Sequence, residues 1–169
     1  DTRDGPLVCQ TEQGGTIDAH PFQDGDQLYL YFKNDGNCCG QPTWIYVQEL
    51  APDGLSLTGE PTQLVRNDKV WEAHVIEAPT MVRQDGSYYL FFSANDYGNE
   101  RYAVGYATCD SPTGPCEDAP ENPILKSLLQ NPPVIGPGHQ DIIEIDGEDW
   151  IIYHAWEVAG GSKTNRRQM

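Results

Sequence analysis

Three segments of the chain repeat one pattern, and this repeat constrains the possible fold more than any other feature. Each segment opens with an ionisable residue, Asp18, Glu77 or His139, and continues into an apolar, aromatic-rich run. Each also contains an Asp-Gly pair, at 24–25, 85–86 and 146–147. Strand-turn-strand units that recur at about 60 residues, somewhat above the ~50 of a kelch repeat, are typical of propeller blades. We therefore expect the three ionisable residues to project from the same end of the innermost strands into one cavity.

The rest of the chain carries strand and turn signals. Short aromatic and β-branched runs, bounded by Gly, Asn, Asp or Pro, lie at 27–32, 44–50, 88–93, 102–108 and 149–154. Asp-Gly is the strongest short hairpin signal because its glycine accepts a positive φ. Asp53-Gly54 supplies the outer hairpin of the same blade, between residues 44–50 and 55–65. These patterns predict an all-β fold with four strands in each blade.

Three repeats occupy almost all of the 169 residues. Propellers typically have 4 to 8 blades, so the ring is expected to be incomplete. We expect residues 1–169 to form one partial propeller domain. In it, residues 1–8 would end a blade that begins upstream, and residues 160–169 would begin a further one.

The charge excludes two classes of partner. Twenty-six acidic residues stand against 10 basic ones, which gives a formal net charge of −16. Such a surface repels phosphate backbones and anionic lipid, so neither a nucleic acid nor a membrane surface is expected as a partner. No apolar run approaches the ~20 residues that span a bilayer. A neutral ligand such as a carbohydrate meets no such repulsion.

The five cysteines lack the Cys-x-x-Cys spacing of a zinc site. Cys109 and Cys116 bracket a turn sequence that would bring their sulfur atoms together, and a disulfide there suits an extracellular, secreted protein. The alternative is a pair of reduced, buried thiols. Cys38 and Cys39 are adjacent, and we do not expect them to bond to each other.

Four residues are candidates for chemistry or ligand binding. Asp18 and Glu77 each lie between apolar residues at the head of a strand, and converging carboxylates are the means of glycoside hydrolysis. The alternative is that both cap neighbouring strands. His139 occupies the matching place in its repeat, where it could hold a water or a cation or bind a substrate hydroxyl, although a lone His is often a core residue. Trp71 precedes Glu77 by six residues and could line a sugar subsite.

At these residues the chain resembles family 43 glycoside hydrolases. The similar motifs occur in the family's order, at 17–22, 75–79, 102–107, 111–115, 136–139 and 153–156. The resemblance implies a five-bladed β-propeller, of which blades two to four are present. It also implies inverting hydrolysis of α-L-arabinofuranosidic or β-D-xylosidic bonds in a polysaccharide or oligosaccharide.

The resemblance assigns a role to each matching residue. Glu77 matches the general acid, and Asp18 matches the carboxylate that orients this acid and modulates its pKa. His139 matches an axial residue associated with a central metal, often Ca²⁺, held through water. Arg166 matches an arginine of the fifth blade that contacts substrate or Asp18, and Arg167 fits nearly as well.

The family's general base is an aspartate at the head of the first blade, upstream of Asp1. From the residues alone Asp18 would be the base, and the resemblance overrules that assignment. We therefore expect the chain by itself to hydrolyse glycosides poorly, and its exposed blade edges to favour self-association. Two alternatives are a non-catalytic carbohydrate-binding propeller and a scaffold propeller of the kelch type. The second would lack a convergent set of ionisable residues.

Overall fold

The computed structural model describes residues 5–130, 133–159 and 162–169, which form three antiparallel β-sheets. The first sheet contains β1 (Thr16–Asp24), β2 (Gln27–Asn34), β3 (Trp44–Leu50) and β4 (Leu57–Arg66). The second contains β5 (Ile76–Gln84), β6 (Ser87–Ala94), β7 (Ala103–Cys109) and β8 (Cys116–Asp118). The third contains β9 (Ile135–Ile145), β10 (Glu148–Ala159) and β11 (Ser162–Gln168). Three short 3₁₀ helices are η1 (Thr11–Gln13), η2 (Gly36–Cys39) and η3 (Val70–Glu72).

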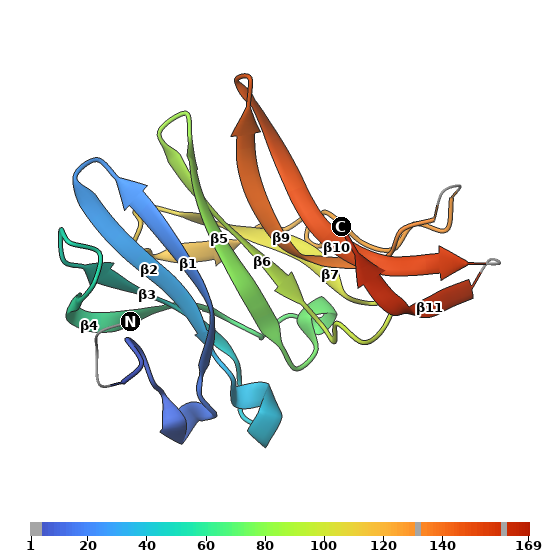
Figure 1. Ribbon diagram of the computed structural model, residues 1–169, viewed down its shortest axis with the longest axis horizontal. Coiled ribbons are helices and arrows are strands. Elements are labelled where there is room, and N and C mark those ends of the chain that lie inside the picture. The colour runs from blue at the N-terminus through green and yellow to red at the C-terminus, as the bar shows by residue number, and fades with distance from the viewer. Residues whose placement is uncertain (1–4, 131–132, 160–161) are drawn as a thin grey trace.

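The sheets stand side by side like blades (Figure 1). The first strands of the sheets are neighbours, since β5 contacts both β1 and β9. The hairpins β1–β2, β5–β6 and β9–β10 all turn at one end, and η1 and η2 lie at the other (Figure 1). Among the described residues, no helix is long and apolar enough to cross a membrane. The predicted all-β fold is confirmed, with four strands in each of the first two blades.

The last strand corrects one expectation. Residues 162–168 do not begin a further blade, because β11 pairs antiparallel with β10, with Trp156 opposite Arg167. The polar sequence of this stretch was misleading, since an outer strand with charged side chains can be solvated and still belong to the sheet. Of the residues expected to end an earlier blade, 1–4 lie outside the described residues.

Each innermost strand carries a β-bulge, and the three bulges correct the alignment of the repeats. The register slips between Ile17 and His20, between Glu77 and Thr80, and between Gly138 and Asp141. The first bulged residue has a positive φ in every case: 57° at Asp18, 53° at Ala78 and 52° at His139. Ala78, not Glu77, is therefore the structural equivalent of Asp18 and His139.

The hairpin turns show the same one-residue offset. The first turn is formed by the two residues between β1 and β2, Gly25 and Asp26, whereas Asp85-Gly86 and Asp146-Gly147 form the other two. The Asp24-Gly25 pair therefore does not match the other Asp-Gly pairs, because Asp24 still belongs to β1.

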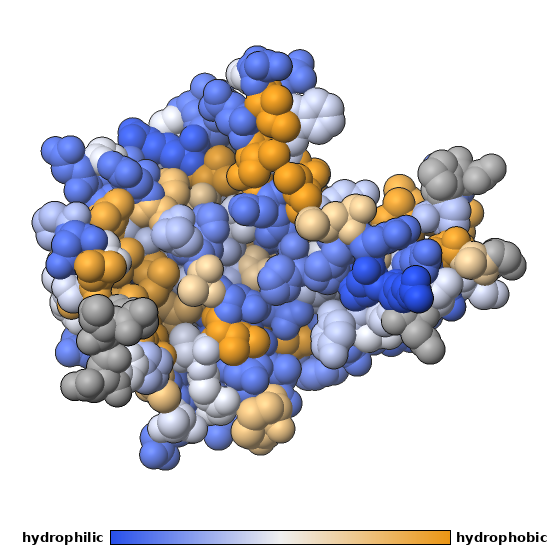
Figure 2. Space-filling model, viewed as in Figure 1, coloured by the Kyte–Doolittle hydropathy of each residue, from blue (hydrophilic) through white to orange (hydrophobic). Residues whose placement is uncertain are grey.

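The main core lies between the first and second sheets. Its fully buried members include Tyr31, Ile76, Leu90 and Phe92. A second cluster packs on the other side of β2, around Leu30 and Phe32. The strand β2 is thus buried on both faces, which explains its continuous apolar run. By contrast, apolar side chains are exposed along the β9–β10 hairpin, where Figure 2 shows hydrophobic surface.

Two disulfides are present in the described residues. Cys109–Cys116 joins β7 to β8, as predicted. Cys38 is bonded to Cys39, so the expectation that they would not bond to each other is wrong. Successive side chains point apart in an extended chain, but these two lie in the tight turn of η2, which is followed by Gly40 with a φ of 70°. Cys9 is an exposed thiol.

Candidate active site

Glu77 lies near the start of β5, where its carboxyl group is held on both sides. The Tyr102 hydroxyl donates a hydrogen bond of 2.5 Å to Oε1, and Lys33 Nζ lies 3.4 Å from Oε2. The Glu77 side chain is 13% exposed and that of Lys33 is fully buried. The buried ammonium is balanced by two carboxylates, since it also lies 3.4 Å from Asp35 Oδ1. Glu77 is thus fixed in orientation yet reachable from solvent.

Asp18 ties the first blade to the residue that follows Glu77. Its Oδ2 accepts a hydrogen bond of 2.9 Å from the backbone N–H of Ala78. Burial, followed by the negative charges of Glu77 and Asp18, raises the pKa of Tyr102. Because Ala78 directly follows Glu77, the hydrogen bond from its N–H places the two carboxylates in one cluster.

Ala78 is also held from the third blade. Its carbonyl accepts a hydrogen bond of 2.8 Å from Gln140 Nε2, while Gln140 Oε1 accepts one of 2.7 Å from the Ser93 hydroxyl. The backbone N–H of His139 donates to Ser93 Oγ at 2.7 Å. The bulges of the three innermost strands are thus linked through the backbone next to Glu77.

His139 joins the cluster through a second histidine. His139 is exposed, and its ring stacks on that of His154 with the ring centroids 5.5 Å apart. His154 in turn stacks on Tyr102 at 6.4 Å. The structure thus brings Asp18, Glu77 and His139 into one contiguous set of side chains.

The described residues contain no group of three or more His, Cys, Asp or Glu side chains that could hold a metal ion. Ca²⁺ takes six to eight oxygen ligands, and His139 offers nitrogen. These residues therefore do not fit a directly bound Ca²⁺, and a calcium ion held by His139 through water stays a prediction.

The arginine that reaches this cluster is Arg167, whereas the Arg166 side chain is exposed. Arg167 Nε donates a hydrogen bond of 2.6 Å to His154 Nδ1, and its guanidinium carbon lies 5.2 Å from the centroid of the Tyr102 ring. Burial, the Arg167 charge and His139 lower the pKa of His154 to about 4. Because β11 belongs to the third sheet, this arginine comes from the third blade, not from a further one.

Trp71 packs mainly within its own blade. Its indole stacks on Phe92 with centroids 5.8 Å apart, and a methyl group at Gly105 would lie 2.7 Å from it. Trp71 also lines a hollow with Asn95, Arg101 and Lys126. A role of Trp71 in sugar binding stays a prediction, and this hollow is where it would apply.

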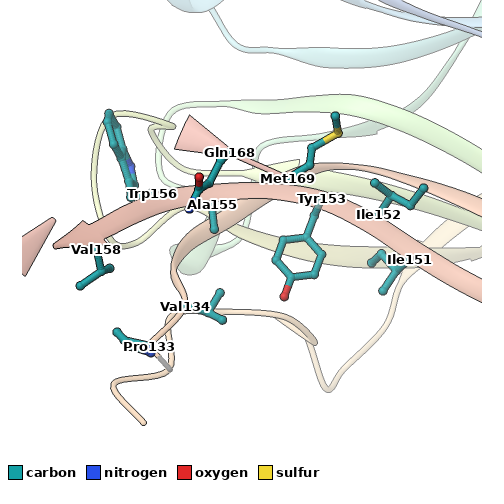
Figure 3. A pocket seen from close by; sticks show the side chains of 10 residues that line it. All are labelled: Pro133, Val134, Ile151, Ile152, Tyr153, Ala155, Trp156, Val158, Gln168 and Met169. Carbon is teal, nitrogen blue, oxygen red and sulfur yellow. The ribbon is translucent and has the colours of Figure 1, made fainter. Parts of the chain in front are cut away.

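A more voluminous cavity lies away from the carboxylates. It measures about 510 Å³ and is lined by side chains of β10, the end of the chain and the segment before β9 (Figure 3). Neither Asp18, Glu77 nor His139 lines it. The side-chain contacts, rather than the cavity volume, thus locate the candidate active site.

Sequence reasoning missed Lys33 and His154 as members of this cluster. Lys33 had a local signal, since it is a cation directly after the apolar run 28–32 in a buried strand. His154 had none beyond its presence in a family motif. Its place beside Tyr102 and His139 depends on how the second and third sheets pack.

The family model for glycosyl hydrolases family 43 matches residues 3–169. The chain belongs to this family. It is 35% identical over 166 residues to the β-D-galactofuranosidase xynD of Aspergillus niger, a match that covers 95% of this chain and 44% of that protein. It is 30% identical over 174 residues to a probable arabinan endo-1,5-α-L-arabinosidase C of Aspergillus flavus, covering 92% and 50%. The family 43 chain thus spans about half the length of these relatives.

Solved structures agree with this membership. A thermostable family-43 glycoside hydrolase has a TM-score of 0.80 and 33% identity, over 90% of this chain and 52% of that one. An endo-1,4-β-xylanase from Bacteroides thetaiotaomicron has a TM-score of 0.84 and 31% identity, over 99% and 56%. The predicted all-β, partial propeller fold of family 43 is confirmed.

Proposed function

We propose that the protein hydrolyses O-glycosidic bonds in arabinose- or xylose-containing polysaccharides or oligosaccharides, with inversion and with Glu77 as general acid. The observation that supports this role is the position of the Glu77 carboxyl group, 13% exposed and held by Tyr102 and Lys33. Protonated Glu77 would give its proton to the glycosidic oxygen as the bond to the anomeric carbon breaks. The Tyr102 hydroxyl and the Lys33 ammonium would then stabilise the carboxylate that remains.

Inversion also requires a base that takes a proton from water on the opposite face of the sugar. Asp18 is occupied by the N–H of Ala78, next to Glu77, which suits a residue that orients the acid. We propose that the base belongs to a longer protein of which this chain is a part. The chain matches 44% of the length of its A. niger relative, which supports this proposal.

The names of the relatives point to furanosides among the possible substrates. One is a β-D-galactofuranosidase and others are arabinan endo-1,5-α-L-arabinosidases. The net charge of −16 suits a neutral polysaccharide. The two disulfides suit an oxidising compartment and support secretion.

The test compares Glu77→Gln with wild type in the full-length protein, on aryl α-L-arabinofuranosides, β-D-xylosides and β-D-galactofuranosides. Loss of a general acid typically costs about 10²–10⁴-fold in rate. The loss should be smaller for a 2,4-dinitrophenyl leaving group, which departs without protonation. Glu117→Gln, on the exposed part of β8, is the matched control and should keep full activity. Binding without turnover in wild type would instead indicate a carbohydrate-binding propeller.

The 169-residue chain should be assayed beside a version extended at its N-terminus. We expect the short chain to have little or no activity, because the base would be missing. Full activity in the short chain would show that the base lies within it, with Asp18 the first residue to substitute.

A further inference from the structure

The Cys38–Cys39 disulfide lies at the end of the blades where the candidate active site is found. It belongs to the loop between β2 and β3, and β2 ends where its partner β1 begins. Thr16, the first residue of β1, is opposite Asn34, the last of β2. Figure 1 shows η2, which contains both cysteines, at the end of the sheets opposite the hairpin turns. Both cysteines are exposed.

Two contacts connect this loop to Glu77. Asn37, the residue before the disulfide, accepts a hydrogen bond of 2.8 Å at Oδ1 from Lys33 Nζ. The same Lys33 Nζ lies 3.4 Å from Glu77 Oε2. The disulfide thus directly follows Asn37, whose side chain contacts the same Lys33 ammonium as the proposed acid Glu77.

The loop is held rigidly against the segment that leads to Asp18. The Asn34 side-chain amide donates to the carbonyls of Gln13 and Pro42 and accepts from the N–H of Trp44. Cys38 Sγ lies 3.8 Å from the Gly14 carbonyl oxygen. A methyl group on Gly14 would lie 2.5 Å from the Asp35 carbonyl oxygen and 3.2 Å from Cys38 Sγ. The two sulfur atoms are therefore exposed on a loop that hydrogen bonds hold in place. Binding a ligand there would cost little entropy, because the loop is already ordered.

The chemistry of this ring suits one face of a sugar. A disulfide between adjacent residues closes a small ring around one peptide bond, and its sulfur atoms are soft and polarisable. It carries no charge and no strong hydrogen-bond donor, although the loop around it is polar (Asp35, Asn37 and Gln41). A pentose presents C–H groups on one face and hydroxyl groups at its rim. The amide of Asn37 has two N–H donors in addition to the oxygen that Lys33 occupies, and they can bind such a hydroxyl.

We propose that the Cys38–Cys39 disulfide is the apolar platform of a sugar subsite, on which a furanose or pentose ring of the substrate packs beside Glu77. The proposal rests on the proposed glycosidase function and adds a binding surface to it. Burial of apolar sugar and sulfur surface contributes roughly 25 cal/mol per Å², so an overlap of about 60 Å² changes affinity about tenfold.

Kinetics of the full-length protein test this subsite. Cys38→Ser/Cys39→Ser should raise KM for arabinan or xylan oligosaccharides about tenfold and leave kcat within about twofold. The matched control is Cys109→Ser/Cys116→Ser, which breaks the disulfide between β7 and β8. It should lower the melting temperature and leave KM unchanged. An unchanged KM in the folded Cys38/Cys39 variant would overturn the proposal, and so would a loss confined to kcat, which indicates positioning through Asn37 and Lys33.

A measurement without substitution covers the case in which the variant does not fold. In wild-type protein labelled with ¹³C at cysteine, a titration with an arabino- or xylo-oligosaccharide should shift the Cβ signals of Cys38 and Cys39. The signals of Cys109 and Cys116 should not move. Saturable binding without any shift at Cys38 and Cys39 would contradict the subsite. Failure of the glycosidase function is recognised separately, by Glu77→Gln turning over substrate as fast as wild type.

Discussion

His154 belongs to the cluster around Glu77, where its ring stacks on Tyr102 and contacts Arg167. Its Nδ1 accepts the hydrogen bond from Arg167 Nε, which only the neutral ring can do. Its pKa is lowered to about 4 from an ordinary 6.5, first by burial and then by the charges of Arg167 and His139. The unfolded chain therefore binds the proton more tightly, and stability that is present above about pH 6.5 is lost as the pH falls toward 4.

We therefore predict that wild type loses stability relative to His154→Gln between about pH 6.5 and 4. Urea unfolding at a series of pH values measures the difference, and ¹³C NMR of the His154 ring gives its pKa directly. A His154 signal that titrates near 6.5 would contradict this account of the Arg167 contact.

Glu72 gives a pH dependence of the opposite sign. It lies fully buried in η3, with Oε2 accepting two backbone N–H bonds of 2.8 Å from Asp68 and Lys69. Burial, with a smaller effect of the Asp118 charge, raises its pKa from 4.5 to about 7. Because the folded state binds the proton more tightly, stability present below about pH 4.5 is lost as the pH rises through 7.

We predict that, between pH 4.5 and 7, wild type loses on the order of 2 kcal/mol relative to Glu72→Gln. The measurement is the free energy of unfolding in urea at each pH. Glu117→Gln, an exposed site, should track wild type throughout. Parallel curves for wild type and Glu72→Gln would show that the Glu72 proton is not bound more tightly in the folded state.

At the scale of elements, the bulge of β9 must pass close to Tyr102. A methyl group on Gly138 would lie 2.1 Å from Tyr102 Cε1, and the ring cannot move away without losing its hydrogen bond to Glu77. Overpacking of this kind costs about 1–3 kcal/mol. We predict that Gly138→Ala destabilises the protein by this amount and also reduces turnover in the full-length protein. Gly5→Ala, with no atom within 4 Å of the new methyl group, should change neither, in thermal unfolding or in rate.

The elements themselves were largely predictable because their signals are local. The runs at 27–32, 44–50, 88–93 and 149–154 lie within β2, β3, β6 and β10. The bulges were not predictable from the sequence. The change of pairing register between Glu77 and Thr80, for example, depends on which residues of β6 lie opposite this part of β5. For the same reason the sequence repeat placed Glu77, rather than Ala78, in register with Asp18. Contacts such as Tyr102 with Glu77 depend on the packing of the chain and have no local signal.

For the molecule as a whole, the third sheet is notable for the large apolar side chains that it exposes. Along β10, Trp150 is 53%, Ile151 37% and Ile152 38% exposed. Figure 2 shows hydrophobic surface over the β9–β10 hairpin. Because successive side chains of a strand point to opposite faces, these residues expose apolar surface on both faces of the hairpin, and such surface favours association. The sequence predicted exposed blade edges, whereas the structure adds an exposed apolar hairpin.

We predict that the 169-residue chain self-associates through this hairpin. Each isoleucine that becomes fully buried contributes about 1.5–3 kcal/mol, so Ile152→Glu should raise the dissociation constant at least about tenfold. Sedimentation at several protein concentrations measures it. Val70→Glu is the matched control, because Val70 is a fully exposed apolar residue on η3, which does not belong to the third sheet. Association that survives Ile152→Glu but is lost in Val70→Glu would place the contact at η3 instead, and the exposed hairpin would then have no part in assembly.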